Sequence, residues 1–220
     1  MRVFLFIPMI CFFISCNNAS RIERIISAPE NSQIHIIKLA DSLGSVTLSI
    51  PSRYDTNFLW THYSDCGSQC EKIKYRFQPK SLPINKESGW LWFDLKDSVE
   101  RFTIIHSGYF YPFRNNFDSI IFLNLHEKIK ADMLLSPDTY TIKSDTIERI
   151  GGHYFSIFMV DLFDSVKSLY SKKVLAATMI KGNSVEFNFE LLTKQNDSLK
   201  DNFLENSRYF LRTVRISNGM

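Results

Sequence analysis

Short runs of alternating apolar and polar residues recur along the chain from residue 33 onward, and such runs predict strands. Residues 34–39 and 46–50 are two of these runs. The turn-forming residues 41–44 between them predict a hairpin that ends at Pro51. Further strands are expected at residues 72–77, 90–93 and 102–105. The first half of the chain is therefore expected to be mostly sheet.

The second half combines helices with longer strands. Asp118 is a good N-cap, and the residues that follow it place apolar side chains four apart on one helical side, at Ile121, Leu125, Ile129 and Met133. Gly182-Asn183 is a tight-turn signal that predicts an antiparallel hairpin between residues 174–180 and 185–191. Other strands are expected at residues 140–142, 147–150 and 154–160, with Gly151-Gly152 as a bend. A last helix begins near Asp197 and is expected to bury Leu199, Phe203, Phe210, Leu211 and Val214.

This order of elements predicts an α+β fold in which helices pack on an antiparallel sheet of about six or more strands. No long linker interrupts residues 33–220, so we expect one domain there. From Arg149 to Ile216 a glycine bend, a long hairpin and a closing amphipathic helix follow one another. This pattern resembles the Mog1/PsbP-like fold, an α/β/α sandwich. Proteins of that group are mostly adaptors bound to larger assemblies, so the resemblance implies a binding role.

The N-terminal residues form a signal peptide. Arg2 is a minimal basic region, residues 3–14 are apolar, and Ser15 is a small residue directly before a cysteine. The sequence Phe13-Ile14-Ser15-Cys16 resembles the lipobox of bacterial lipoproteins. The resemblance implies that residues 1–15 are removed and that Cys16 is acylated. An ordinary secretory signal is the alternative.

Residues 16–32 are polar, are broken by Pro29, and lack a period that buries one face. We expect a flexible tether that holds the domain off a membrane. Asn17 gives no acidic retention signal after the cysteine, which favours the periplasmic side of the outer membrane over the inner membrane. The lipobox and the order of elements are also similar to accessory lipoproteins of Bacteroidetes. The expected location is thus the cell envelope.

The charge balance excludes a nucleic-acid partner. The 220-residue chain has 26 basic and 23 acidic residues, and loss of Arg2 with the signal peptide leaves 25 and 23, a net charge of +2. Nucleic-acid binding requires a strongly basic field, and here the two signs are interspersed.

Cys66 and Cys70 are the only other cysteines after Cys16, and a matched pair in an oxidising envelope predicts a disulfide. His62 precedes Cys66 by four residues, so a metal site on one helical face is an alternative. Gly67 disfavours that helix and no fourth ligand adjoins, so no metal or other cofactor is expected. Redox chemistry is a further alternative.

Two surfaces are candidates for binding. Lys72, Lys74 and Arg76 alternate with apolar residues and place three cations on one strand face. The plain alternative is the solvated face of a half-buried strand. The second candidate is an aromatic segment before the first helix, made of Tyr109, Phe110, Tyr111 and Phe113. Core packing at the end of the sheet is its alternative.

No catalytic constellation is evident. His126-Glu127 lacks the second histidine of a zincin helix, and the chain has no Gly-x-Ser-x-Gly elbow. We therefore favour a non-catalytic, lipid-anchored envelope protein in an adaptor role that binds another envelope component, expected to be a protein. Two alternatives stay open: a hydrolase of envelope polymers whose site is assembled only by the fold, and a carrier of a small apolar ligand.

Overall fold

The structure is a computed structural model, and it describes residues 31–40, 42–67, 70–84, 98–109, 118–134 and 140–217. The predicted signal peptide, Cys16 and most of the predicted tether lie outside the described residues. The expected strand at residues 90–93 and three members of the aromatic segment, Phe110, Tyr111 and Phe113, also lie outside them.

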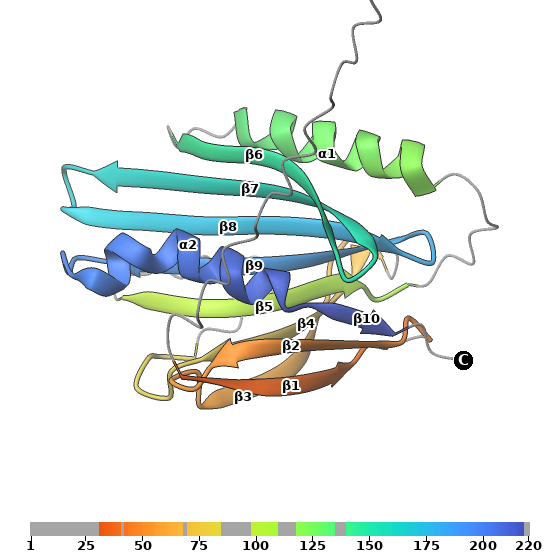
Figure 1. Ribbon diagram of the computed structural model, residues 1–220, viewed down its shortest axis with the longest axis horizontal. Coiled ribbons are helices and arrows are strands. Elements are labelled where there is room, and N and C mark those ends of the chain that lie inside the picture. The colour runs from red at the N-terminus through yellow and green to blue at the C-terminus, as the bar shows by residue number, and fades with distance from the viewer. Residues whose placement is uncertain are drawn as a thin grey trace, which may run out of the picture.

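Two antiparallel sheets form the described fold (Figure 1). The small sheet has the order β1-β2-β10, with β1 (Ser32–Lys38), β2 (Ser45–Pro51) and β10 (Arg215–Ser217). The large sheet has the order β3-β4-β5-β9-β8-β7-β6, with β3 (Thr56–His62), β4 (Lys72–Gln78), β5 (Val99–Ser107), β9 (Asn183–Thr193), β8 (Leu169–Ile180), β7 (His153–Asp164) and β6 (Thr141–Ile150).

The main core lies between the small sheet and one face of the large sheet. Side chains on alternate positions of a strand share a face, so Phe77, Phe102 and Phe189, which lie directly across from one another on β4, β5 and β9, point the same way. The rings of Phe102 and Phe189 stack at 4.3 Å between centroids. Alternate residues of β2 complete the layer, and Val46 and Ile50 are fully buried. This burial fixes the register of both sheets.

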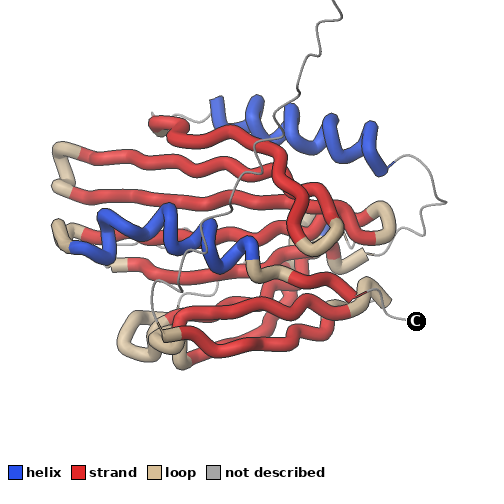
Figure 2. Tube along the Cα trace, in the orientation of Figure 1, coloured by secondary structure: helices blue, strands red, loops and turns tan. Residues whose placement is uncertain are grey.

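The two helices cover opposite faces of the large sheet. Helix α2 (Ser198–Arg212) lies on the same face as the small sheet and buries Phe203, Leu204, Phe210 and Leu211. Glu148, on the α2 side of β6, accepts hydrogen bonds from Arg208 and Arg212. Helix α1 (Asp118–Leu134) lies on the other face. Figure 2 shows α2 and α1 as the two helical segments beside the strands.

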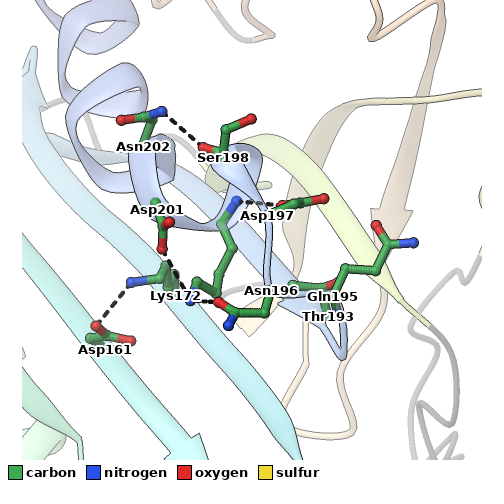
Figure 3. Close-up of polar contacts among 10 residues, drawn as sticks. Asp161, Lys172, Thr193, Gln195, Asn196, Asp197, Ser198, Asp201 and Asn202 are labelled. Carbon is green, nitrogen blue, oxygen red and sulfur yellow. Dashed lines mark hydrogen bonds and ion pairs between the residues drawn. The ribbon is translucent and has the colours of Figure 1, made fainter.

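Polar contacts determine where α2 begins (Figure 3). The Asp197 carboxylate accepts a hydrogen bond from the backbone N–H of Lys200 at 3.0 Å, as an N-cap does. The side-chain amide of Asn202 donates to the Ser198 carbonyl at 2.9 Å. Asp197 was expected to start this helix, and the structure confirms it.

The α+β class and the antiparallel sheet are confirmed, as are the hairpin of β1 and β2 and the hairpin of β8 and β9. Two strands had no prediction, β3 and β10. The segments predicted at 140–142 and 147–150 are wrong as separate strands, because they form the single strand β6 with an irregularity between Ile142 and Ser144. Neither described helix is long and apolar enough to cross a membrane.

The predicted apolar side of α1 is only partly correct. Phe122 and His126 are the buried residues in the part of the helix whose side chains are described, whereas Leu125 is half-buried. The reason is that the sheet face beneath α1 is mixed in polarity. It offers Ser156 and the ring of Phe158, which His126 can contact through both a nitrogen atom and its own ring.

Candidate functional site

An open groove of about 290 Å³ lies between strands β1 and β3, which are the edge strands of the two sheets. Its sides include Ile36 and Lys38 on β1 and Leu59 on β3. Figure 1 shows the two strands beside each other at the same side of the molecule. We refer to this site as the edge groove.

One side of the edge groove is the unpaired edge of β1. Among the described strands β1 pairs with β2 alone. Leu39 N–H bonds to the Gly44 carbonyl and Ser52 N–H bonds to the Asn31 carbonyl, each at 2.9 Å, so odd-numbered residues of β1 turn their backbone groups toward β2. Because these directions alternate along an antiparallel strand, Ile34 and Ile36 turn theirs toward the free edge.

The side chains of Ile34 and Ile36 are also exposed, at 75% and 74%. Natural proteins usually protect an edge strand with charge, proline or a bulge. The seven-residue β1 has one charged residue, Lys38, no proline, and a continuous register with β2. An apolar, regular edge of this kind is suited to pairing with another chain.

Strand β3 provides the floor of the edge groove, because the small sheet does not extend over it. The ring of His35 on β1 meets the ring of Phe77 on β4 edge to face, at 5.1 Å between centroids, so β1 lies above β4. Leu59 lies directly across from Tyr75 and therefore shares the inner face of the large sheet. Nevertheless Leu59 is 59% exposed. The small sheet is thus one strand short of covering β3.

The charge of the edge groove is slightly positive. Burial lowers the pKa of His35, so its imidazole is neutral at neutral pH. Lys38 is exposed at one end of β1, and none of the described residues that line the groove is acidic. An apolar ligand with a carboxylate near Lys38 would match this surface.

The predicted basic stripe lies on the opposite face of β4 from the groove floor. Lys72 is half-exposed and pairs with Glu186 at 3.6 Å. Lys74 and Arg76 are buried, at 9% and 2% exposure, so these two positions form neither the alternative solvated face nor part of an exposed cationic binding stripe. The two cations are buried because β3, a strand that was not predicted, lies beside β4. The aromatic side chains of β3 cover the cations, with Arg76 lying 4.7 Å from the centre of the Trp60 ring.

Further ion pairs extend from this stripe across the same face. Arg101 bonds to Glu190 at 2.6 Å, and Lys173 lies 3.3 Å from the other oxygen of that carboxylate. Burial acts to raise the pKa of Glu190, but Arg101 and Lys173 together hold it below its usual value. Because these charges satisfy one another, the face is better explained as a structural network than as an anion-binding surface.

A serine, a histidine and an aspartate meet beneath α1. Ser156 Oγ lies 2.7 Å from His126 Nδ1, and His126 Nε2 lies 3.0 Å from Asp145 Oδ1. These distances fit a nucleophile with its base. However, Ser156 has no exposed surface, so a substrate cannot reach its hydroxyl. Lys130 also pairs with Asp145, at 2.7 Å, so the cluster fastens α1 to the sheet.

A second, larger pocket of about 420 Å³ lies between the start of α1 and the turn that joins β6 to β7. Phe122, Leu123, Ile147, Tyr154 and Met179 contribute to its lining. Leu123 and Tyr154 are more than half exposed, so the pocket is an open apolar hollow. We refer to it as the α1 pocket.

Cys66 and Cys70 form a disulfide, with their Cα atoms 5.9 Å apart. The alternative metal site required a helix that carries His62 and Cys66 on one face. The structure instead places His62 at the end of β3 and Cys66 in a turn. No group of metal-ligating side chains occurs among the residues that the structure describes.

Tyr109 is the one residue of the aromatic segment that is described. It is 45% exposed, and its backbone N–H bonds to Ser107 Oγ at 3.1 Å. It lies beyond the end of β5 and does not line the edge groove. The groove was not predicted from the sequence, because Leu59 belongs to β3, for which no strand was predicted. The one available signal was the pair of isoleucines, Ile34 and Ile36, at alternate positions of β1.

No family model matches this chain, and no curated protein matches it. Among solved structures, a protein of unknown function from Pseudomonas aeruginosa is similar, with 8% sequence identity and a TM-score of 0.36. The match covers 82% of this chain and 95% of that chain. A similarity at this level gives no argument about function.

Proposed function

We propose that this chain is a lipid-anchored envelope protein with a Mog1/PsbP-like domain, and that it binds another envelope protein in the edge groove without catalysing a reaction. The observation that carries the proposal is the inner face of β3 beside the outer edge of β1, which no other strand of the described residues covers. Ile36 and Leu59, which line the groove, and Ile34 on the same strand expose more than half of their surface. Exposed apolar groups gathered at one site are typical of protein interaction surfaces.

The anchor and the groove are compatible in position. Acylation at Cys16 would leave residues 17–31 between the lipid and β1, which begins at Ser32. Fifteen extended residues reach about 50 Å, which is enough for the groove to meet a partner above the lipid headgroups. Each buried methylene of an acyl chain contributes about 0.8 kcal/mol, so two or three chains would hold the protein at the membrane.

A catalytic function has less support in the described part of the chain. The one constellation with a nucleophile and a base, at Ser156 and His126, has no access for a substrate. The edge groove contains no carboxylate among its described lining residues. A hydrolase of envelope polymers would need both access and an acid or base.

The experiment is site-specific photo-crosslinking in cells. The full-length lipoprotein carries a photoreactive amino acid at Leu59, and a matched version carries it at Val166, which is 93% exposed in the turn between β7 and β8. We expect one reproducible protein adduct from Leu59 and none from Val166. With the photoreactive residue kept at position 59, the adduct should disappear when Ile36→Asp is added, because Ile36 lines the same groove. Equal labelling from both positions, or labelling from Val166 alone, would refute the assignment of the groove.

The α1 pocket supports a second candidate function, as a carrier of a small apolar ligand. Its volume of about 420 Å³ lies within the range of ligand pockets, and its lining is mostly apolar. Extraction of the purified lipoprotein with organic solvent, followed by mass spectrometry, tests this function. A bound apolar compound that is lost in Tyr154→Asp and kept in Leu59→Asp would support it, and an empty extract would contradict it.

A further inference from the structure

We infer that the edge groove takes an extended segment of its partner, which adds to the small sheet as a strand next to β1. The inference rests on the proposed function and specifies what part of the partner binds. Its basis is the relation between the two sheets. The small sheet stops above β4, and the next strand position, above β3, is not filled by any described residue.

The outer edge of β1 carries backbone groups that can pair with such a strand. The N–H and C=O groups of Ile34 and Ile36 point to the free edge, as the register with β2 requires. A segment of about seven residues would match the length of β1. Main-chain hydrogen bonds would then supply affinity, as in other cases of strand addition.

The side chains around this position define the chemistry of the segment. On its inner side the added strand would meet Leu59, and on its outer side it would lie beside Ile34 and Ile36. Both sides therefore favour apolar, β-branched residues. A carboxylate at one end would lie near Lys38, the charged residue of β1.

The position of β3 favours a single extended segment as the occupant. A folded partner that offered the edge of a two-layered sheet would place its second layer beneath that edge, in the space of β3. The same argument applies to a second copy of this chain. Its β4 lies below its β1, as His35 and Phe77 show, and would collide with β3 of the first copy.

Fluorescence anisotropy with designed peptides tests the inference. The probe is a labelled, capped eight-residue peptide of alternating valine and threonine with a glutamate at each end. A matched peptide has N-methyl groups on alternate backbone nitrogens, and another has lysine at both ends. The protein is the full-length lipoprotein in detergent. We expect N-methylation to weaken binding about tenfold or more, and the lysine ends to weaken it severalfold.

Two variants of one residue separate backbone from side-chain effects. Ile36→Pro removes the outward N–H, and proline is tolerated in an edge strand where its nitrogen faces solvent. Ile36→Thr keeps that N–H and the branched Cβ atom. We expect about a tenfold loss of peptide binding in Ile36→Pro and less than a threefold loss in Ile36→Thr. Because the N-methylated peptide leaves the protein unchanged, the inference stays testable if Ile36→Pro folds poorly.

The outcomes distinguish the inference from the proposed function. One outcome is peptide binding that is unchanged by N-methylation and by Ile36→Pro but lost in Leu59→Asp. This result would overturn strand addition and leave the groove as a binding site. A specific crosslink from Leu59 in cells without any peptide binding would also overturn strand addition. If the Ile34 and Ile36 amides are already protected in the protein alone, the residues before β1 cover this edge, and both proposals fail.

Discussion

Arg76 provides a quantitative test of the buried cationic face. The side chain is 2% exposed, its guanidinium lies 4.7 Å from the centre of the Trp60 ring, and its Nε donates to Thr103 Oγ1 at 3.3 Å. A desolvated cation–π contact contributes about 1–2 kcal/mol, and the hydrogen bond about 1 kcal/mol. Arg76→Gln also shortens the buried stem by one methylene, about 0.8 kcal/mol. We therefore expect Arg76→Gln to destabilise the fold by about 2–4 kcal/mol.

Lys72→Gln is the matched control, because it removes the same charge from the same strand face. Lys72 is 49% exposed and pairs with Glu186 at 3.6 Å, and such surface pairs contribute less than about 0.5 kcal/mol. Urea denaturation followed by tryptophan fluorescence compares the two variants, with unchanged m-values as the condition for interpreting the midpoints. If Arg76→Gln costs no more than Lys72→Gln, the Arg76 side chain is solvated in solution, and the stripe becomes an anion-binding candidate again.

Three further predictions concern other parts of the fold. Glu148→Gln should cost about 1 kcal/mol at pH 7. Burial acts to raise the pKa of Glu148, but hydrogen bonds from the two arginines of α2 lower it overall. The stability that these bonds contribute is therefore present above the ordinary carboxyl pKa and is lost as pH falls through the lowered pKa of Glu148. Urea midpoints that give Glu148→Gln the same deficit at low pH as at pH 7 would contradict this. Reduction of the Cys66–Cys70 disulfide should lower stability by about 2 kcal/mol, because it closes a short loop, and a midpoint unchanged by reductant would argue against it. Gly151→Ala should lower the free energy of unfolding by about 1–3 kcal/mol, because φ at this position is +55° and a Cβ atom would lie 2.7 Å from the Val214 carbonyl oxygen. A melting temperature equal to that of the parent protein would show that the turn can move away from β10.

Most of the sheet could be predicted from sequence because its strands alternate. Each correct strand, such as β2 and β9, has apolar side chains at every second position and turn residues at its ends. Strand β3 escaped prediction because its polarity does not alternate in this way. Phe58 and Trp60 cover cations on one face, while Leu59 is exposed on the other. An edge strand that is buried on neither face by apolar packing lacks the signal that such predictions depend on.

The candidate site could not be derived from sequence for a related reason. The edge groove depends on how far the small sheet extends over the large one, and that offset is set by tertiary contacts such as His35 on Phe77. The basic stripe was identified correctly as one strand face, but alternation does not reveal which neighbouring strand will cover it. The three-residue β10 was missed because it is too short to show a period, and its pairing with β2 is a long-range contact.

Amide hydrogen exchange of β1 in the full-length protein tests the central claim most directly. If the strand position beside β1 is free, the Ile34 and Ile36 amides exchange quickly, whereas the neighbouring His35 and Ile37 amides, which face β2, are protected. Addition of the alternating valine–threonine peptide should then slow exchange at Ile34 and Ile36 and leave His35 and Ile37 unchanged. Equal protection of all four amides before any peptide is added would contradict the claim, because the edge would already be covered.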